Sequence, residues 1–141
     1  MTATATRHRS RIPLRIVVAA ALGIDAIVHL MLAANYQQAS PGGIGAGTLF
    51  RLEAAAAILT GIYVLLRGSR PAFTAAFIVT LSALTAVLLY RYVNVPQIGP
   101  IPAMYEPTWY FAKTTTAIAE AVGALLSAAA LTTHPKPARR P

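Results

Sequence analysis

The sequence contains no cysteine, which excludes disulfides, thiolate metal sites and redox motifs of the Cys-x-x-Cys kind. Acidic residues are also scarce, with four Asp and Glu against twelve Lys and Arg. Charged residues make up 11% of the 141 residues, whereas an average soluble domain has about 25%. Hydrophobic residues reach 56%. This composition points to a membrane protein rather than to a soluble domain.

Four apolar runs account for most of the chain, and each supplies the roughly 20 residues that cross a hydrocarbon core of about 30 Å. They lack the regular polar positions of a helix on the surface of a soluble protein. The first run is longer than the apolar part of a signal peptide, so we expect it to be retained. We predict an all-α, four-helix transmembrane bundle of up-down-up-down topology over residues 14–133, with spans at about 14–35, 48–66, 71–93 and 108–131.

Positive charge is distributed unequally between the connections. Basic residues occupy both tails (1–13 and 134–141) and the turn at 67–70, whereas the connections at 36–47 and 94–107 contain no Lys or Arg. The positive-inside rule then places both termini in the cytoplasm of a multi-pass protein of the cell membrane. The basic tails would meet lipid headgroups, and nucleic acid is not an expected partner.

Acidic residues lie in or beside the runs. Counting about 1.5 Å per residue from the cytoplasmic end puts His29, Glu53 and Glu120 on three helices at a common height of about 20 Å, with Asp25 about 5 Å lower. The basic side chains of Arg51, Arg91 and Lys113 lie above them, toward the outer face. A charge near the bilayer centre costs about 2.5–3.5 kcal/mol, so these groups should pair with one another or serve a function.

Helical spacing is compatible with a shared site. Asp25 and His29 are four residues apart and face the same way. The last run carries a stripe of polar or small residues on one side, Lys113, Thr116, Glu120, Gly123 and Ser127. Most aromatic residues also gather near the outer face, Trp109 and Tyr110 among them. Two interpretations remain open. One is a pocket that opens to the outside, and the other is a set of ion pairs of Glu53 and Glu120 with Arg51 and Lys113 that fixes helix register.

The pocket interpretation predicts acid/base chemistry on a lipophilic molecule, quinone-like or isoprenoid-like, because burial favours the neutral forms of carboxyl and imidazole groups. No metal ligands are assigned, since one histidine with carboxylates matches known metal sites only partly, and whether a metal binds stays open; haem is not expected. No cofactor is assigned, and whether the protein is an enzyme stays open.

The alternatives are a non-catalytic membrane subunit, within a homo-oligomer or larger complex, and a small proton-coupled exporter. The candidate catalytic residues are Asp25, His29, Glu53 and Glu120, and the candidate ligand-binding residues are Arg51, Arg91, Trp109, Tyr110 and Lys113.

One segment resembles a known family. The stretch FRLEAAAAILTGIYVLLRGSRPAF (Phe50–Phe73) resembles the second-helix signature of DoxX-like membrane proteins, in which a Glu opens the helix, a glycine follows and a short Arg-containing turn ends it. The preceding LGIDAIVHLM is similar to the glycine-to-histidine beginning of some relatives. The resemblance implies a four-helix bundle and, for some members, association with quinone-linked oxidoreductases. It marks His29 and Glu53, while the absence of cysteine argues against a thiol-redox version.

Overall fold

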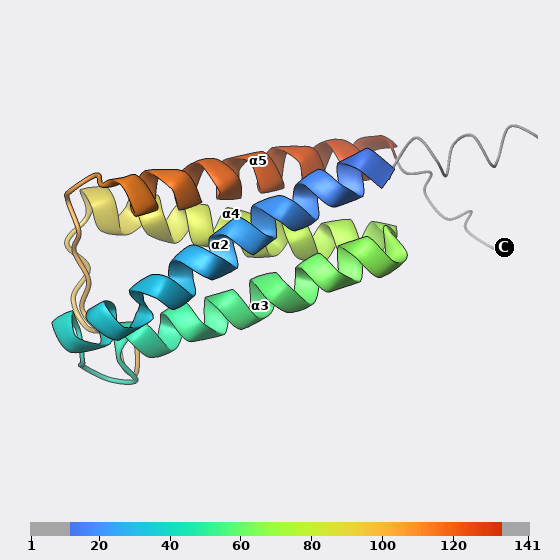
Figure 1. Ribbon diagram of the computed structural model, residues 1–141. Helices are drawn as coiled ribbons and strands as arrows, with labels where there is room; N and C mark the ends of the chain where they lie inside the picture. Colours follow the sequence, from blue (N-terminus) through green and yellow to red (C-terminus); the bar gives the residue numbers. More distant parts are fainter. Residues whose placement is uncertain (1–11, 134–141) are drawn as a thin grey trace, which may run out of the picture.

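The computed structural model describes residues 12–133, so the predicted basic tails lie almost entirely outside the described residues. Within residues 12–133 the chain forms four α-helices, each long and apolar enough to cross a membrane. The predicted all-α four-helix bundle is therefore confirmed (Figure 1). The helices are α2 (Ile12–Ala39), α3 (Ala46–Arg67), α4 (Arg70–Tyr92) and α5 (Phe111–Thr133).

Two helix boundaries differ from the predicted spans. Helix α2 continues to Ala39 rather than ending near residue 35, because the sequence has no glycine or proline to stop it before Pro41. Helix α5 begins at Phe111 rather than at residue 108. The residues that precede it belong to the proline-containing connection at 94–110, in which Glu106 donates its backbone N–H to the carbonyl of Tyr90.

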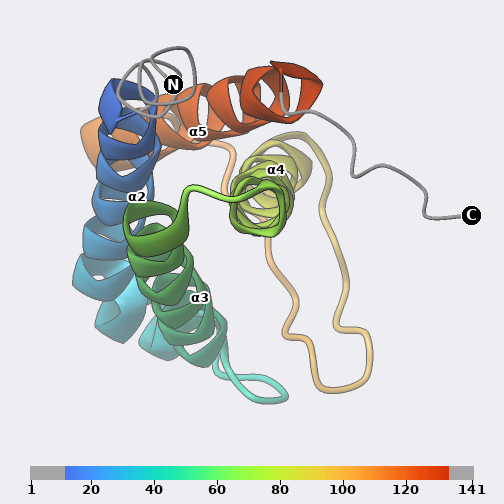
Figure 2. The same ribbon diagram turned by 90° about the vertical axis from the view of Figure 1, so that its right-hand side faces the viewer.

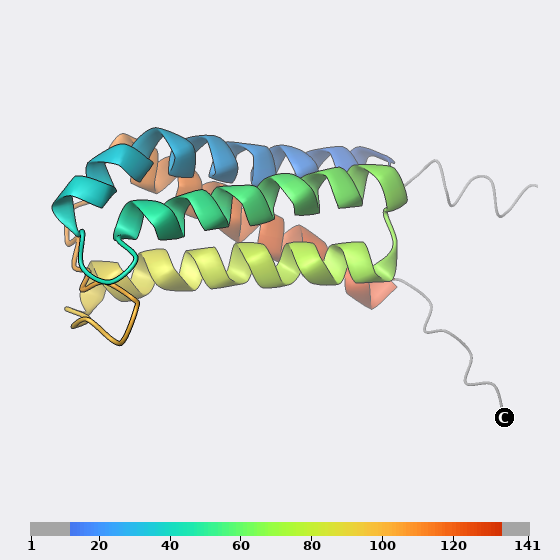
Figure 3. The ribbon, with the colours of Figure 1, turned by 90° about the horizontal axis from the view of Figure 1, so that it is seen from below.

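The helices form a closed ring in which successive helices are antiparallel (Figure 1, Figure 3). Helix α2 packs against α3 and α5, and α4 packs against the same two helices from the other side (Figure 2). The first residues of α2, the last residues of α5 and the α3–α4 turn all lie at one end of the bundle (Figure 1). The connections α2–α3 and α4–α5 lie at the opposite end, which agrees with the predicted up-down-up-down order.

The half of the bundle nearest the α3–α4 turn is filled by small and branched apolar side chains. Phe73 is the largest of the fully buried side chains. Close packing matters here because lipid tails are as apolar as the helix surfaces, so van der Waals contact rather than water exclusion holds the helices together. The buried cluster consists of Val18, Leu22, Ala26, Ala54, Ala57, Val64, Ala72, Phe73, Ala76 and Ala130.

Arginine side chains bind the helix ends at this side of the bundle. The Nε of Arg15 donates to the carbonyl of Val64 at 3.1 Å, and its guanidinium also reaches the carbonyl of Leu65. Arg70 donates to the carbonyl of Leu131 at 2.7 Å. The carbonyl of Val64 also accepts from the N–H of Gly68 at 2.9 Å, and cations favour the C-terminal end of the helix dipole, where these carbonyls lie. The arginines thereby join α2 to α3 and α4 to α5.

The opposite end is covered by the long α4–α5 connection. Its two arms pair through isolated antiparallel bridges, Val95 with Met104 and Ile98 with Ile101. The α2–α3 loop is attached to it, because the N–H of Ile44 donates to the carbonyl of Pro100 at 2.9 Å. This cover leaves a space between itself and the apolar half of the bundle.

Candidate ligand-binding site

A cavity of about 670 Å³ occupies the half of the bundle beneath the α4–α5 connection. Its volume lies in the range of about 300–1,000 Å³ that small-molecule sites occupy. Most of its wall is apolar, and its polar groups gather at a base and at a rim. The apolar wall includes Leu32, Leu49, Leu52, Ala56, Ala83, Ala86, Val87, Ile101 and Met104.

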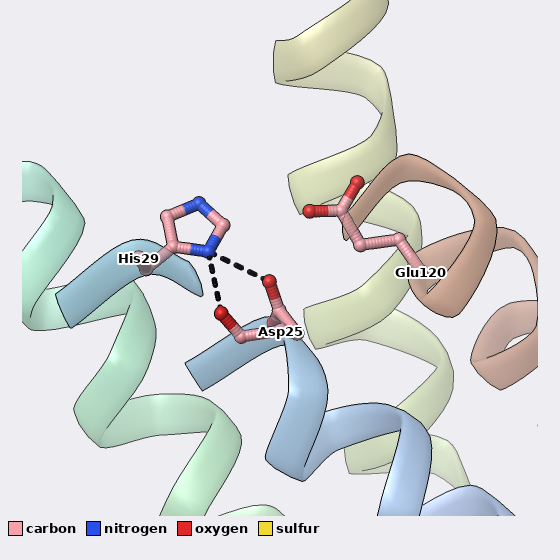
Figure 4. Close-up of side chains that lie close together, drawn as sticks. All are labelled: Asp25, His29 and Glu120. Atoms are coloured by element: carbon pink, nitrogen blue, oxygen red, sulfur yellow. Dashed lines mark hydrogen bonds and ion pairs between the residues drawn. The ribbon is translucent and has the colours of Figure 1, made fainter. Parts of the chain in front are cut away.

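His29 and Thr116 form the polar base of the cavity, and both are bound to Asp25 beneath it. The Nδ1 of His29 lies 2.7 Å from Oδ1 of Asp25 and 3.0 Å from the carbonyl oxygen of the same residue (Figure 4). Both of these oxygens accept hydrogen bonds when Asp25 is ionised, so Nδ1 then carries the proton. Nε2 is left as the nitrogen with which His29 can contact a ligand.

Thr116 joins carboxyl groups of two helices. Its hydroxyl lies 3.1 Å from Oδ1 of Asp25 on α2 and 3.2 Å from Oε1 of Glu120 on α5. Both carboxyl-bearing residues are completely buried, with 0% exposure. A hydroxyl has one proton and can donate to one acceptor at a time. One of the two carboxyl groups must therefore supply a proton of its own if both contacts are hydrogen bonds.

Glu53 reaches the cavity from α3 and is half-buried. Within the described part of the chain its Oε1 atom is buried without a hydrogen-bond partner. Phe50, one turn earlier, packs edge-on against the His29 ring with 5.0 Å between centroids. Phe50 also stacks on Tyr36 at 4.4 Å. The His29 imidazole is thereby held between the Phe50 ring and Asp25.

The rim of the cavity combines two phenols with a lysine. The hydroxyls of Tyr36 and Tyr110 are 2.8 Å apart. Burial raises the pKa of the Tyr110 phenol above its ordinary value of 10.0, so this hydroxyl stays protonated and able to donate at neutral pH. Lys113 is buried, donates to the backbone carbonyl of Glu106, and lies 5.5 Å from the Trp109 ring.

The predicted site residues fall into three groups. His29, Glu53, Tyr110 and Lys113 line the cavity. Asp25 and Glu120 do not line it but lie directly beneath its base, bound to His29 and Thr116. Their carboxyl groups meet at one hydroxyl, whereas residue counting placed Asp25 about one helical turn lower. The third group consists of Arg51, Arg91 and Trp109, which are not part of the lining.

Arg51, Arg91 and Trp109 lie outside the cavity lining for different physical reasons. Arg51 is exposed because it stands two positions from Glu53 on α3, and residues at that spacing point in different directions. The guanidinium of Arg91 lies 5.0 Å from the Tyr92 ring and 5.9 Å from the Trp109 ring. Trp109 is 40% exposed and serves as the aromatic partner of both Arg91 and Lys113.

Cation–carboxylate pairing of the kind considered from the sequence is not found among residues 12–133. Neither Glu53 nor Glu120 has a Lys or Arg nitrogen within 4.0 Å, and the salt bridge at the site is Asp25–His29. That pair lies within one helix, so it cannot by itself fix the register between helices. Lys113, one of the two cations considered for such pairs, is bound to a backbone carbonyl instead.

The cavity lining also contains polar side chains that the predicted set lacks, Thr116, Tyr36 and Glu106 among them. For Thr116 the signal was present, since it lies in the polar stripe of the last run between Lys113 and Glu120. Tyr36 and Glu106 lie near the covered end, where an interfacial position explains a polar or aromatic residue equally well.

Comparison of the chain with protein families, with curated proteins and with solved structures finds no match. The resemblance of Phe50–Phe73 to DoxX-like proteins therefore stays a prediction from the sequence.

Proposed function

We propose that this protein is a multi-pass protein of the cell membrane that binds a lipophilic small molecule, quinone-like or isoprenoid-like, in the cavity between its helices. The observation that supports this best is an apolar cavity of about 670 Å³ with His29 and Glu53 at its base and Lys113 and two tyrosines at its rim. A largely apolar wall with a few convergent polar groups is the usual form of a small-molecule site.

The polar groups at the base of the cavity and those at its rim favour a ligand with polar atoms at both ends of a flat apolar body. A ring carbonyl or hydroxyl at the base would contact Nε2 of His29, while a second oxygen would contact Tyr36, Tyr110 or Lys113 at the rim. An apolar tail would lie along Leu32, Leu52 and Val87. A quinone has this distribution of polar and apolar atoms.

His29 is also placed to transfer a proton to or from such a ligand. Its Nδ1 is held by Asp25 at 2.7 Å, and a carboxylate at one imidazole nitrogen orients the ring and stabilises the positive charge that forms when the other nitrogen takes up a proton. Glu53 could exchange a proton with the same ligand from α3. The resemblance of Phe50–Phe73 and of LGIDAIVHLM to DoxX-like proteins supports this proposal, since it marks Glu53 and His29 and implies, for some members of that family, association with quinone-linked oxidoreductases.

The distribution of basic residues supports an orientation in which both termini are cytoplasmic. The α4–α5 connection and the cavity beneath it would then face the outer leaflet. A lipophilic ligand would enter from the outer half of the bilayer rather than from the cytoplasm.

The proposal is tested by quenching the fluorescence of Trp109, the single tryptophan of the chain, with decylubiquinone added to the full chain in detergent. We expect saturable quenching. Ala56→Phe, which fills the cavity from α3, should weaken binding by at least about tenfold through lost space. Ala55→Phe is the matched control, since Ala55 is the neighbouring exposed residue outside the lining.

Thermal unfolding of each variant separates a filled cavity from a misfolded protein, and Ala86→Phe repeats the test from α4. A short isoprenoid alcohol added as a competitor distinguishes the two ligand classes. Quenching that never saturates, or equal binding by Ala55→Phe, Ala56→Phe and Ala86→Phe, would contradict the proposal.

A further inference from the structure

We propose that Asp25, His29 and Glu120 together bind one divalent transition-metal ion directly beneath the cavity base. This inference does not depend on the lipophilic ligand. It rests on the geometry of three side chains that α2 and α5 bring together, on unsatisfied oxygen atoms, and on the charge of the cluster.

The three side chains converge. Each offers one ligand atom, and these atoms all lie within 4.8 Å of one another. Figure 4 shows the Glu120 carboxyl group directed from α5 toward Asp25 and His29 on α2. All three residues are buried, two of them completely. Because α2 and α5 pack against each other, the cluster is held by a helix–helix interface rather than by a loop.

Two oxygen atoms of the cluster point to a missing partner. Among the described residues, Oδ2 of Asp25 and Oε2 of Glu120 are buried and have no hydrogen-bond partner. An unsatisfied buried carboxyl oxygen is expensive, since its desolvation is not offset by any contact. Thr116 binds the other oxygen of each carboxyl group. A metal ion between the two groups would satisfy the oxygen atoms that Thr116 leaves free.

Charge gives a separate argument. The titratable group that faces the cluster from another helix is Glu53 of α3, whereas Lys113 is bound to the carbonyl of Glu106. In residues 12–133 no Lys or Arg nitrogen lies within 4.0 Å of Asp25 or Glu120. When both carboxyl groups are ionised and the imidazole is neutral, the cluster carries a charge of −2, which one divalent cation neutralises. Buried charges of one sign are retained when they are paired or coordinate a metal.

The donor set selects the class of metal. Imidazole with carboxylate suits Mn²⁺, Fe²⁺, Co²⁺ and Zn²⁺, whereas Ca²⁺ and Mg²⁺ prefer oxygen ligands throughout. Metal–ligand bonds of about 2.0–2.2 Å place neighbouring ligand atoms about 3 Å apart. The three candidate ligand atoms lie within 4.8 Å of one another, so side-chain shifts of about 1–2 Å bring them to that spacing.

Three protein ligands leave coordination positions open. His29 and Thr116 line the cavity, so these positions would face it, and a ligand oxygen at the base could occupy one. Thr116 is then a positioning residue, because its hydroxyl can donate to one of the two carboxylates without contacting the metal. Such supporting hydrogen bonds typically change metal affinity by about 10–100-fold.

The test uses the full chain in detergent, stripped of metal with a chelator and titrated with Co²⁺, with bound metal counted by mass spectrometry and the site followed by visible absorption. We expect one Co²⁺ per chain. Asp25→Asn and Glu120→Gln should abolish binding, and Thr116→Val should weaken it by about 10–100-fold. Glu53→Gln is the matched control, since it removes a nearby carboxylate outside the set, and it should leave the stoichiometry unchanged.

Binding by the histidines of the tails is excluded by a variant with His8→Asn and His134→Asn, which should keep its Co²⁺. The intact far-ultraviolet circular dichroism of each variant shows that the helices persist. The proposal is overturned if the wild-type chain binds no Co²⁺, or if Asp25→Asn and Glu120→Gln bind it as well as wild type.

The outcome is distinguishable from that of the proposed function. Ala56→Phe, which fills the cavity from α3 and leaves the three metal ligands unchanged, should keep its Co²⁺ while losing decylubiquinone. Co²⁺ binding without quinone binding would refute the ligand proposal alone. Quinone binding without Co²⁺ binding would refute the metal site alone.

Discussion

At the scale of the residue, Thr116 decides how the polar groups beneath the cavity are organised. Its hydroxyl contacts the Asp25 carboxyl at 3.1 Å and the Glu120 carboxyl at 3.2 Å. One side chain thereby connects α2 with α5 and keeps two acidic groups in a common arrangement. The single hydroxyl proton serves one acceptor at a time, so if both contacts are hydrogen bonds the second proton belongs to one of the carboxyl groups.

Thr116→Val keeps the shape of the side chain and removes the hydroxyl. We expect it to lower the free energy of unfolding by about 1 kcal/mol, because two buried carboxyl groups lose their shared partner and interhelical hydrogen bonds in membranes are worth about 0.6–2 kcal/mol. Thermal or SDS-induced unfolding in detergent micelles measures the effect. Thr115→Val is the control, since the Thr115 hydroxyl bonds only to the carbonyl of Phe111 in its own helix. Equal effects of the two variants would refute this role of Thr116.

At the scale of the element, the packing of α4 against α5 depends on Gly123. A Cβ atom at this position would lie 2.7 Å from Cγ2 of Thr80. Thr80 is fully buried and its hydroxyl is bound to the carbonyl of Ala76 at 2.7 Å, so the methyl group cannot easily move away. Small residues at such crossings let helix backbones approach closely in membranes.

Gly123→Ala should therefore destabilise the protein by about 1–3 kcal/mol through overpacking. Gly23→Ala on α2 is the matched control, because a Cβ atom there meets nothing within 4 Å, and alanine favours helix over glycine by up to about 1 kcal/mol. Thr80→Ser removes the opposing methyl group and keeps the hydroxyl, so the double variant Gly123→Ala/Thr80→Ser should recover most of the loss. A double-mutant cycle on unfolding free energies measures this coupling, and additive effects would show that the contact is not the cause.

At the scale of the whole molecule, the two ends of the bundle are built differently. One end is filled by an apolar cluster and joined by arginine contacts to helix C-termini, whereas the other contains the cavity beneath the α4–α5 connection. The basic end would face the cytoplasm by the positive-inside rule. That orientation decides whether the cavity opens to the outer or to the cytoplasmic face of the membrane.

The absence of cysteine makes the orientation directly testable, because each introduced cysteine is the single thiol of the chain. In intact cells, Gln97→Cys in the α4–α5 connection should react with a membrane-impermeant maleimide. Ser69→Cys in the α3–α4 turn should react only after the cells are opened. Both positions are outside the cavity lining. The opposite labelling pattern would reverse the orientation and place the cavity at the cytoplasmic face.

Much of the site could be predicted from the sequence because an apolar span of this length forms a helix, and a helix has a fixed rise per residue. Asp25 and His29 share a face by their spacing, and residue counting brought Glu53 and Glu120 to the same half of the bundle. Counting measures height along a helix but not the direction in which a side chain points. Arg51, Arg91 and Trp109 have the right height, yet they lie outside the cavity lining.

The sequence by itself determined the helices, their order and the gathering of polar residues in one half of the bundle, since hydrophobicity, length and charge suffice for these. Only the tertiary structure decided which of those residues meet. The ring order of the helices and their close approach at small residues turn Asp25, Thr116 and Glu120 toward a common point, and they turn His29 and Glu53 toward a cavity. Rotation about a helix axis is set by packing against neighbouring helices, and no local pattern in the chain contains that information.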